Sequence, residues 1–232
     1  MHDPVFEHIS RQIQNAELCL DPYPHFFVEQ IFPEDFYEEL LAHLPETALY
    51  TSLADTDKVS KGSYQERSIY ALQDSAIEEP CLQSLSKILH SQEWIKLALS
   101  KFDVYVKERF GILIDAMEFS TTAQLIKDRS NYAIGPHTDL PHRVCTFLFY
   151  LPKTKDQQHL GTSIYRPCDP SWKCQGHHHY VFKDFIKEKT LPFLPNSLFG
   201  FLKSDHSFHG VEPIVEKNIE RSLINCYVKW KA

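Results

Sequence analysis

Hydrophobic positions recur at helical spacing in the first 111 residues of the chain. Residues 34–44 follow Pro33, carry acidic residues in their first turn and place a hydrophobic stripe along one side. That stripe consists of Phe36, Leu40, Leu41 and Leu44. Further helices are predicted over 81–90 and from Ser91, which can cap the helix N-terminus, to Arg109. The polar stretch 51–73 lacks periodicity and is predicted to be a long loop.

The pattern changes after Gly111 to short segments rich in β-branched and aromatic residues. The predicted strands are 117–126, 143–151, 161–167, 178–185, 197–203 and 221–230. Helices followed by many short strands favour an α+β domain built on a sandwich or barrel. We therefore predict one domain over 1–232, with a mainly helical support layer in 1–111 and a strand-rich core in 112–232.

Composition and charge narrow the function classes. The 232 residues are 43% hydrophobic and 24% charged, which is ordinary for a globular protein. The formal net charge of -7 gives no general attraction to nucleic acids or to anionic membranes, so neither is an expected partner. The first 15 residues lack the pattern of a signal peptide, and no apolar run is long enough to span a membrane. We expect a soluble cytoplasmic protein whose six cysteines are reduced.

The first candidate for chemistry is His137-Thr138-Asp139. Residues two apart in an extended segment point to the same side, so His137 and Asp139 could supply two ligands of a facial metal triad. In a chain with 13 histidines, chance alone produces about one H-x-D sequence. A capped turn with a surface histidine is the alternative interpretation.

A second candidate group lies near the C-terminus. His209 is 70 positions after Asp139 and is followed by Gly210-Val211, and Arg221 comes 12 positions later at the start of a predicted strand. Alternation along this strand places Arg221 with Leu223, Asn225 and Tyr227 on one face, and places Ile224, Cys226 and Val228 on the face that packs against the helices. A buried arginine needs a partner, which is either an acidic ligand or a structural ion pair.

The chain resembles the iron(II)/2-oxoglutarate-dependent dioxygenases, and within them the prolyl-4-hydroxylase-like branch. The resemblance is carried by the His-Thr-Asp sequence, the distant His-Gly-Val sequence and the arginine 12 residues after His209. The resemblance covers roughly residues 120–230, and residues 24–45 are similar to the strand and helix that begin such domains. It implies a double-stranded β-helix, or jelly roll, with N-terminal helices packed on one sheet.

The resemblance assigns roles by position. His137, Asp139 and His209 would bind iron(II), Arg221 would hold the far carboxylate of 2-oxoglutarate, and Tyr150 would reach inward to the same carboxylate. A buried tyrosine bonded to the backbone is the alternative for Tyr150. Relatives acting on collagen-type chains usually have lysine at the position of Arg221, which argues against such a substrate. Iron(II), 2-oxoglutarate and O2 are the implied cofactors and co-substrates, with ascorbate as a stimulant.

Several other histidines are alternative candidates for metal binding or for the site. His206 lies three residues before His209, but the distance to Arg221 and the following Gly-Val favour His209. The tract 177–179, with two cysteines upstream, invites a zinc assignment, although its spacing fits no common zinc finger and a polar loop is preferred. Those cysteines are Cys168 and Cys174. His142 and Arg143 could line the barrel mouth or belong to a solvated loop, and His25 is expected to be a packed or surface residue.

The predicted function is hydroxylation of an unactivated C–H bond with release of succinate and CO2. The alternative is a cupin-like metal-binding isomerase or binding protein without oxygenase activity, and an inward Arg221 argues against it. Substrate specificity is assigned to loops 51–73 and 153–180. We expect a small molecule or a glycan as substrate ahead of a protein side chain.

Overall fold

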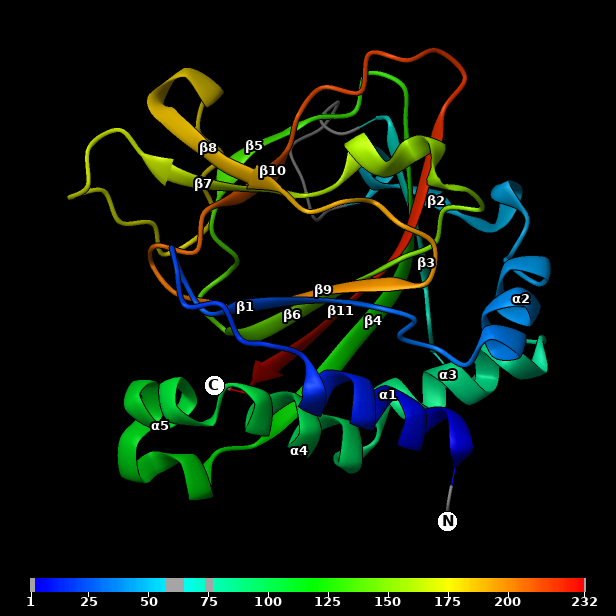
Figure 1. Ribbon diagram of the computed structural model, residues 1–232, viewed down its shortest axis with the longest axis horizontal. Helices are drawn as coiled ribbons and strands as arrows, with labels where there is room; N and C mark the ends of the chain where they lie inside the picture. Colours follow the sequence, from blue (N-terminus) through cyan, green and yellow to red (C-terminus); the bar gives the residue numbers. More distant parts are fainter. Residues whose placement is uncertain (1–2, 57–64, 74–76, 232) are drawn as a thin grey trace.

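Two antiparallel β-sheets face each other in the computed structural model, which describes residues 3–56, 65–73 and 77–231 (Figure 1). The larger sheet has seven strands, in the spatial order β1 (His25–Glu29), β9 (Ser197–Leu202), β6 (Arg143–Tyr150), β11 (Glu220–Trp230), β4 (Phe119–Arg129), β3 (Arg67–Ala71) and β2 (Thr51–Ser52). The smaller sheet has the order β5 (Ile134–His137), β10 (His209–Val211), β7 (Ser163–Pro167) and β8 (Phe185–Thr190). This arrangement confirms the predicted α+β jelly roll.

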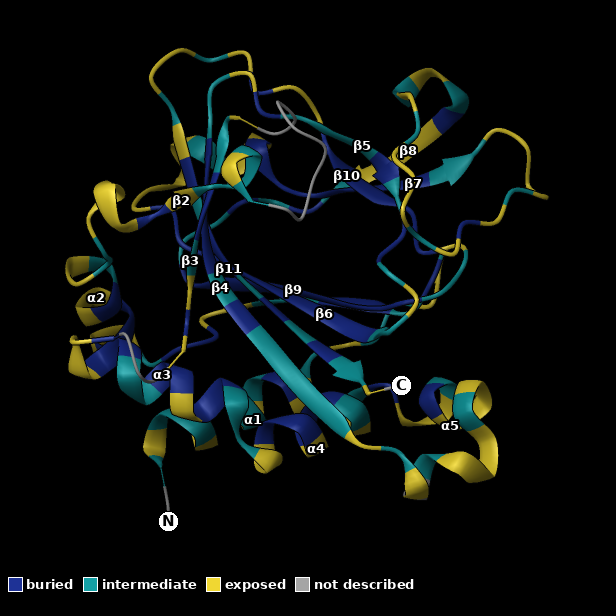
Figure 2. Ribbon diagram, turned by 180° about the vertical axis from the view of Figure 1, so that it is seen from behind, coloured by how far each residue is buried: buried dark blue, intermediate teal, exposed yellow. Residues whose placement is uncertain are grey.

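Helices cover the outer face of the larger sheet, as predicted (Figures 1 and 2). They are α1 (Pro4–Asn15), α2 (Glu34–Ala42), α3 (Pro80–His90), α4 (Gln92–Lys101) and α5 (Asp103–Phe110). Short 3-10 helices are η1 (Thr47–Leu49), η2 (Leu53–Asp55), η4 (Gly111–Ala116), η5 (Lys155–Leu160) and η6 (Phe182–Asp184). Within the described ranges, no helix has the length and hydrophobicity required to cross a bilayer.

The main core lies between the helices and the larger sheet. Phe147 on β6 is fully buried, and its ring lies 5.0 Å from that of Trp94 on α4 and 6.2 Å from that of Phe26 on β1. Ile224 and Cys226 on β11 join the same core. The opposite face of β11 carries Arg221, Leu223, Asn225 and Tyr227 toward the space between the two sheets, so the alternation predicted for this strand is confirmed.

Three predicted elements differ from the structure. The helix predicted from Ser91 to Arg109 is two helices, because the buried Phe102 leaves helical geometry (φ -116°, ψ 23°) between α4 and α5. Ser91 does cap α4 by accepting the N–H of Trp94 at 3.0 Å.

The prediction of a long loop over 51–73 is also wrong for the part of this segment that the structure describes. The segment contributes strands β2 and β3, and β3 pairs with β4; residues 57–64 lie outside the described residues. The strand predicted over 178–185 is a loop and a 3-10 helix, and β8 begins only at Phe185. Its aromatic residues, which suggested a strand, instead pack in a small cluster around Phe208.

Candidate metal centre and its cavity

His137, Asp139 and His209 lie together at one end of the smaller sheet. His137 ends β5 and His209 begins β10, and the two are directly paired across these strands. Asp139 follows two residues after His137 in the turn toward β6. One ligand atom from each residue lies within 4.8 Å of the others, close enough for the three to hold one metal ion. The structure therefore brings His209 to His137 and Asp139, although it follows Asp139 by 70 positions in the sequence.

Hydrogen bonds orient both imidazoles. The Nδ1 atom of His137 lies 2.9 Å from the carbonyl oxygen of Gly135, and that of His209 lies 3.0 Å from the carbonyl oxygen of Ser207. A carbonyl oxygen only accepts, so each Nδ1 carries the proton and each Nε2 keeps a lone pair. The Nε2 atom of His209 lies 4.0 Å from a carboxylate oxygen of Asp139. This is the arrangement in which a histidine ligates a metal through Nε2.

Asp139 is buried and is held as a carboxylate by its neighbours. Arg143 donates to Oδ1 at 2.7 Å, and the Thr146 hydroxyl donates to Oδ2 at 2.6 Å. Burial alone would raise the pKa of Asp139, but the charge of Arg143, the proximity of His209 and the bond from Thr146 outweigh it and lower the pKa to about 2. Arg143 also stacks on the Tyr227 ring at 3.8 Å, which holds its guanidinium in place.

The two histidines are neutral at physiological pH. Burial lowers the pKa of both, and the neighbouring rings of His209 and His179 lower that of His137 further. The ring centroids of His137 and His209 are 4.4 Å apart. Two neutral imidazoles and one carboxylate on one side of an ion form the donor set of a 2-His-1-carboxylate site, which suits iron(II) and leaves positions open.

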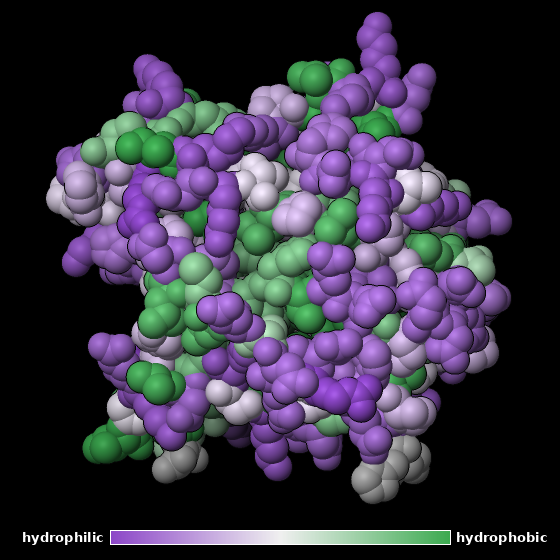
Figure 3. Space-filling view, in the orientation of Figure 1, coloured by the Kyte–Doolittle hydropathy of each residue, from purple (hydrophilic) through white to green (hydrophobic). Residues whose placement is uncertain are grey.

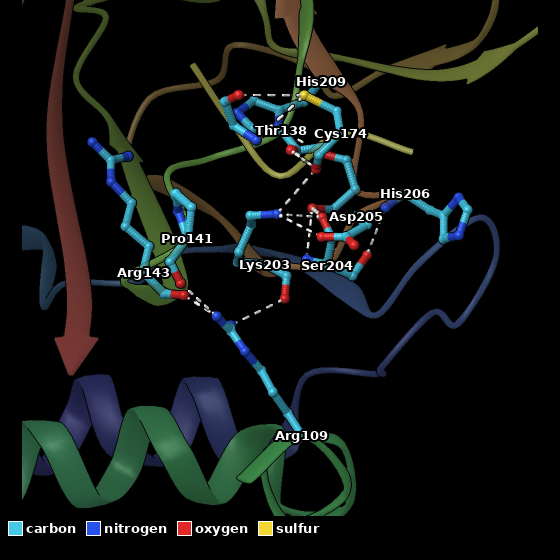
Figure 4. Close-up of polar contacts among 12 residues, drawn as sticks. Arg109, Thr138, Pro141, Arg143, Cys174, Lys203, Ser204, Asp205, His206 and His209 are labelled. Carbon is cyan, nitrogen blue, oxygen red and sulfur yellow. Dashed lines mark hydrogen bonds and ion pairs between the residues drawn. The ribbon is translucent and has the colours of Figure 1, made fainter. Parts of the chain in front are cut away.

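The turn that carries Asp139 is tied to the helical layer by Arg109 from α5 (Figure 4). Its guanidinium donates to the carbonyl oxygens of Pro141 at 2.6 Å and Arg143 at 2.8 Å, with a longer contact of 3.4 Å to Lys203. The Thr138 hydroxyl adds a bond to the carbonyl oxygen of Cys174 at 2.6 Å. The sequence contains no signal for Arg109, because its partners are backbone atoms far along the chain.

A cavity of about 690 Å³ lies between the sheets, with the three candidate ligands in its wall. Its apolar lining includes Ile69, Ile126, Leu148, Phe201 and Leu223, and its polar lining includes Arg67, Gln124, Arg143, Asn225 and Tyr227. In the space-filling view, hydrophobic residues show at the centre of the opening between the sheets, framed by hydrophilic ones (Figure 3). The volume is in the range of cavities that bind small ligands.

Arg221 lines the same cavity and is only 1% exposed. Its Nε donates to the Leu160 carbonyl oxygen at 2.6 Å, and its two terminal nitrogens donate to Asp128 at 2.8 Å and to the Thr162 hydroxyl at 3.3 Å. The structure therefore contains the structural ion pair, one of the two alternatives for this arginine, and Arg221 also faces the cavity, so its role toward an acidic ligand stays a prediction. Sequence reasoning missed Asp128, because nothing along the chain connects it with Arg221, 93 positions away.

Comparison with known proteins adds the fold relationship. No protein-family model and no curated protein matches the chain. A prolyl 4-hydroxylase from Phytophthora capsici superposes with a TM-score of 0.62 at 17% identity, over 99% of this chain and 66% of that one. A Pseudomonas putida prolyl-4-hydroxylase gives 0.55 at 13% identity, over 95% and 98% of the two chains. The chain has the fold of the prolyl 4-hydroxylases.

The same fold occurs in SnoK, a non-heme alpha ketoglutarate dependent carbocyclase from nogalamycin biosynthesis, with a TM-score of 0.52 at 11% identity over 99% of this chain and 87% of SnoK. The predicted resemblance to the prolyl-4-hydroxylase-like branch is thus confirmed as a likeness of fold. This chain spans slightly less than two thirds of the Phytophthora protein.

Within this prolyl-4-hydroxylase fold, Tyr150 lies fully buried on the face of β6 that points toward the smaller sheet. Its hydroxyl accepts the backbone N–H of Thr162 at 3.2 Å, and its ring packs 4.7 Å from that of Phe193. Tyr150 is not among the described residues that line the cavity. The backbone hydrogen bond of the alternative interpretation is thus present, Arg221 lies 5.7 Å from the Tyr150 ring, and the role of Tyr150 toward 2-oxoglutarate stays a prediction.

Exposure to solvent distinguishes the two histidines considered as the third metal ligand. His206 is exposed and points away from the site in Figure 4, whereas His209 is buried, which supports the choice of His209. His177 and His179 line the cavity, but in the described part of the chain the tract 177–179 belongs to no group of three that could hold a metal ion. His25 is packed between Tyr23 and Phe199, as expected.

Proposed function

We propose that this protein is an iron(II)/2-oxoglutarate-dependent oxygenase that hydroxylates an unactivated C–H bond. The observation that carries the proposal is one cavity with two kinds of site in its wall. The His137–Asp139–His209 group, in which Asp139 and His209 are buried, occupies one part of it, and the buried guanidinium of Arg221 lies in another. A metal centre and a carboxylate-binding arginine in a shared cavity are what a 2-oxo acid needs in order to chelate a metal while its far end is held.

His137, Asp139 and His209 would hold the iron. Their donor set fits, because both Nε2 lone pairs are available and Asp139 is ionised. When bound, iron(II) with 2-oxoglutarate and O2 supplies the oxidation that turns the co-substrate into succinate and CO2 and hydroxylates the substrate. Thr146 and Arg143 keep the Asp139 carboxylate ionised and hold its orientation through the hydrogen bonds that they donate to it.

Arg221 would bind the far carboxylate of 2-oxoglutarate. Its fork suits a carboxylate, and its burial strengthens the charge-assisted hydrogen bonds that it donates. Leu148 and Leu223 in the cavity wall would exclude water from the reacting groups. Tyr150 would help to position Arg221 indirectly, because its hydroxyl accepts the backbone N–H of Thr162, whose own hydroxyl accepts a hydrogen bond from Arg221.

For the substrate we propose a small molecule or a glycan. A cavity of about 690 Å³ is large enough for the co-substrate together with part of a small substrate. SnoK, which shares the fold of this chain, is an alpha ketoglutarate dependent carbocyclase from nogalamycin biosynthesis, and this supports a small-molecule substrate.

The test is formation of succinate from 2-oxoglutarate by purified protein with iron(II), ascorbate and O2, beside His137→Ala and Arg221→Ala. The proposal expects turnover by the unaltered protein and its loss in both variants. If the unaltered protein shows no turnover, binding of 2-oxoglutarate to the metal-loaded protein is measured by calorimetry. Absence of turnover and of binding would overturn the proposal in favour of a metal-binding jelly roll without oxygenase activity.

A further inference from the structure

A second group of metal-ligating side chains lies in the helical layer. It consists of Glu39 on α2, His43 directly after α2, and Cys81 in the first turn of α3. One ligand atom from each residue lies within 4.8 Å of the others. Helices α2 and α3 pack against each other at one side of the molecule, so residues far apart in the sequence meet there (Figure 1). None of the three is among the described residues that line the cavity.

Helical spacing places the two ligands from α2 on one side of that helix. Glu39 and His43 are four residues apart, so their side chains are neighbours on the same face. The Nδ1 atom of His43 lies 2.9 Å from the backbone carbonyl oxygen of Glu39. Because a carbonyl oxygen only accepts, Nδ1 carries the proton, and in the neutral ring Nε2 keeps a lone pair for a cation. A backbone carbonyl orients His137 and His209 in the same way.

Cys81 supplies a thiol from the inner side of the group. It is 4% exposed, whereas Glu39 and His43 are exposed, so the group lies where the packed helices meet solvent. Burial and the negative charge of Glu39 raise the pKa of the Cys81 thiol, although the backbone N–H groups of Leu82 and Cys81 act in the opposite direction. A bound cation would convert the thiol to a thiolate, with release of its proton to water.

The donor set selects zinc among the common divalent cations. Thiolate and imidazole ligands favour zinc over magnesium and calcium, and a carboxylate oxygen is also a regular zinc ligand. The thiolate and the carboxylate together neutralise a divalent charge. Ligand atoms around tetrahedral zinc are about 3.3–3.7 Å apart, so the group has to contract only slightly. Two of its three side chains are exposed and can rotate toward the third, and a water molecule would complete the tetrahedron.

We propose that Glu39, His43 and Cys81 form a zinc site that links α2 to α3. The observation that carries the proposal is the meeting of three different donors from two helices, one of them a buried free thiol. The role of the ion is structural, because it would hold the start of α3 against the end of α2 in the layer that supports the larger sheet. The proposal does not depend on the proposed oxygenase activity, since the site lies outside the cavity wall.

The experiment uses Co²⁺ as a coloured substitute for Zn²⁺, with the thiols kept reduced. A thiolate bound to Co²⁺ gives a charge-transfer absorption in the near ultraviolet. The candidate metal centre in the cavity contains no sulfur ligand, so Co²⁺ bound there does not contribute to this absorption. The full chain is titrated with Co²⁺ while the absorption is followed, and Zn²⁺ is then added to displace the Co²⁺.

The proposal expects the absorption in the unaltered protein, its removal by Zn²⁺ and its absence from Cys81→Ser. His43→Ala should weaken the Co²⁺ affinity of this site at least about 100-fold, and this variant also serves if Cys81→Ser fails to fold, because His43 is exposed. Cys168→Ser is the matched thiol control, since Cys168 is an exposed free cysteine. His90→Ala is the matched imidazole control, since Nδ1 of His90 also lies 2.8 Å from a carbonyl oxygen four residues earlier. Both controls should behave like the unaltered protein.

Two results would overturn the zinc site. One is the absence of the charge-transfer absorption from the unaltered protein at saturating Co²⁺. The other is an absorption that Cys81→Ser or His43→Ala leaves unchanged, which would assign the bound Co²⁺ to a different cysteine. Either result would leave the proposed oxygenase function untouched, because succinate formation is measured independently of this site.

Discussion

Replacing Thr146 by valine tests whether the hydrogen bond to Asp139 holds the candidate metal centre in its binding geometry. Valine has nearly the shape of threonine, so the substitution removes the hydroxyl and leaves the packing. The lost bond is 2.6 Å long and joins a 2% exposed threonine to a 6% exposed carboxylate. A bond of this kind to a charged group contributes about 1.5–3 kcal/mol. Without it, Oδ2 of Asp139 loses a partner in a buried site.

The expected consequence is a 10- to 100-fold weaker affinity for Mn²⁺, measured by calorimetry, because about 1.4 kcal/mol corresponds to a factor of ten. The free energy of unfolding of the metal-free protein should fall by about 1–3 kcal/mol in urea titrations. The loss of the hydroxyl also removes one cause of the low pKa of Asp139, so this pKa should rise.

Thr121→Val provides the matched control. The Thr121 hydroxyl oxygen is buried, and in the described part of the protein it has no hydrogen-bond partner. The same chemical change there should leave metal affinity unchanged and leave stability equal or improved. If Thr146→Val kept its metal affinity within about threefold of the unaltered protein, the view that Thr146 orients Asp139 would be refuted.

Other predictions concern the ligand choice, the core and the response to acid. His209→Ala should abolish tight Mn²⁺ binding while His206→Ala leaves it unchanged, since His206 is exposed; equal loss in both would refute the assignment. Phe147→Ala should lower the free energy of unfolding by about 3–5 kcal/mol in urea, because the ring is fully buried against the helical layer. The lowered pKa of Asp139 contributes stability of about 2 kcal/mol that is present above its ordinary pKa of 3.8 and is lost as the pH falls toward 2. The stability difference between unaltered protein and Asp139→Asn should therefore shrink over that interval, and a constant difference would contradict the sign.

Much of the candidate site follows from local sequence patterns. The two-residue spacing of His137 and Asp139 and the alternation along β11 are consequences of extended backbone, which repeats every two residues wherever the strand lies. They predicted correctly which side chains of β11 face the cavity and which pack on the helices. The choice of His209 over His206 also came from the sequence, through its distance to Arg221.

Other features were decided only by tertiary structure. The segment of β3 looked like a loop because its polar residues show no periodicity, yet pairing with β4 makes it a strand and delivers Arg67 to the cavity. No sequence pattern indicated a role for Asp128 or Arg109. The partner of Asp128 lies on a neighbouring strand, and the partners of Arg109 are backbone carbonyl oxygens of distant turns.

The physical reason for this division is the range of the interactions. The sequence by itself determined most of the N-terminal helices and C-terminal strands, the faces of β11 and the set of candidate metal ligands, because these depend on local periodicity and on residue chemistry. The register that sets Asp128 between Arg67 and Arg221, and the turn held by Arg109, depend on contacts between residues far apart in the chain. Such contacts form only when the sheets and helices pack together, so only the tertiary structure could place them.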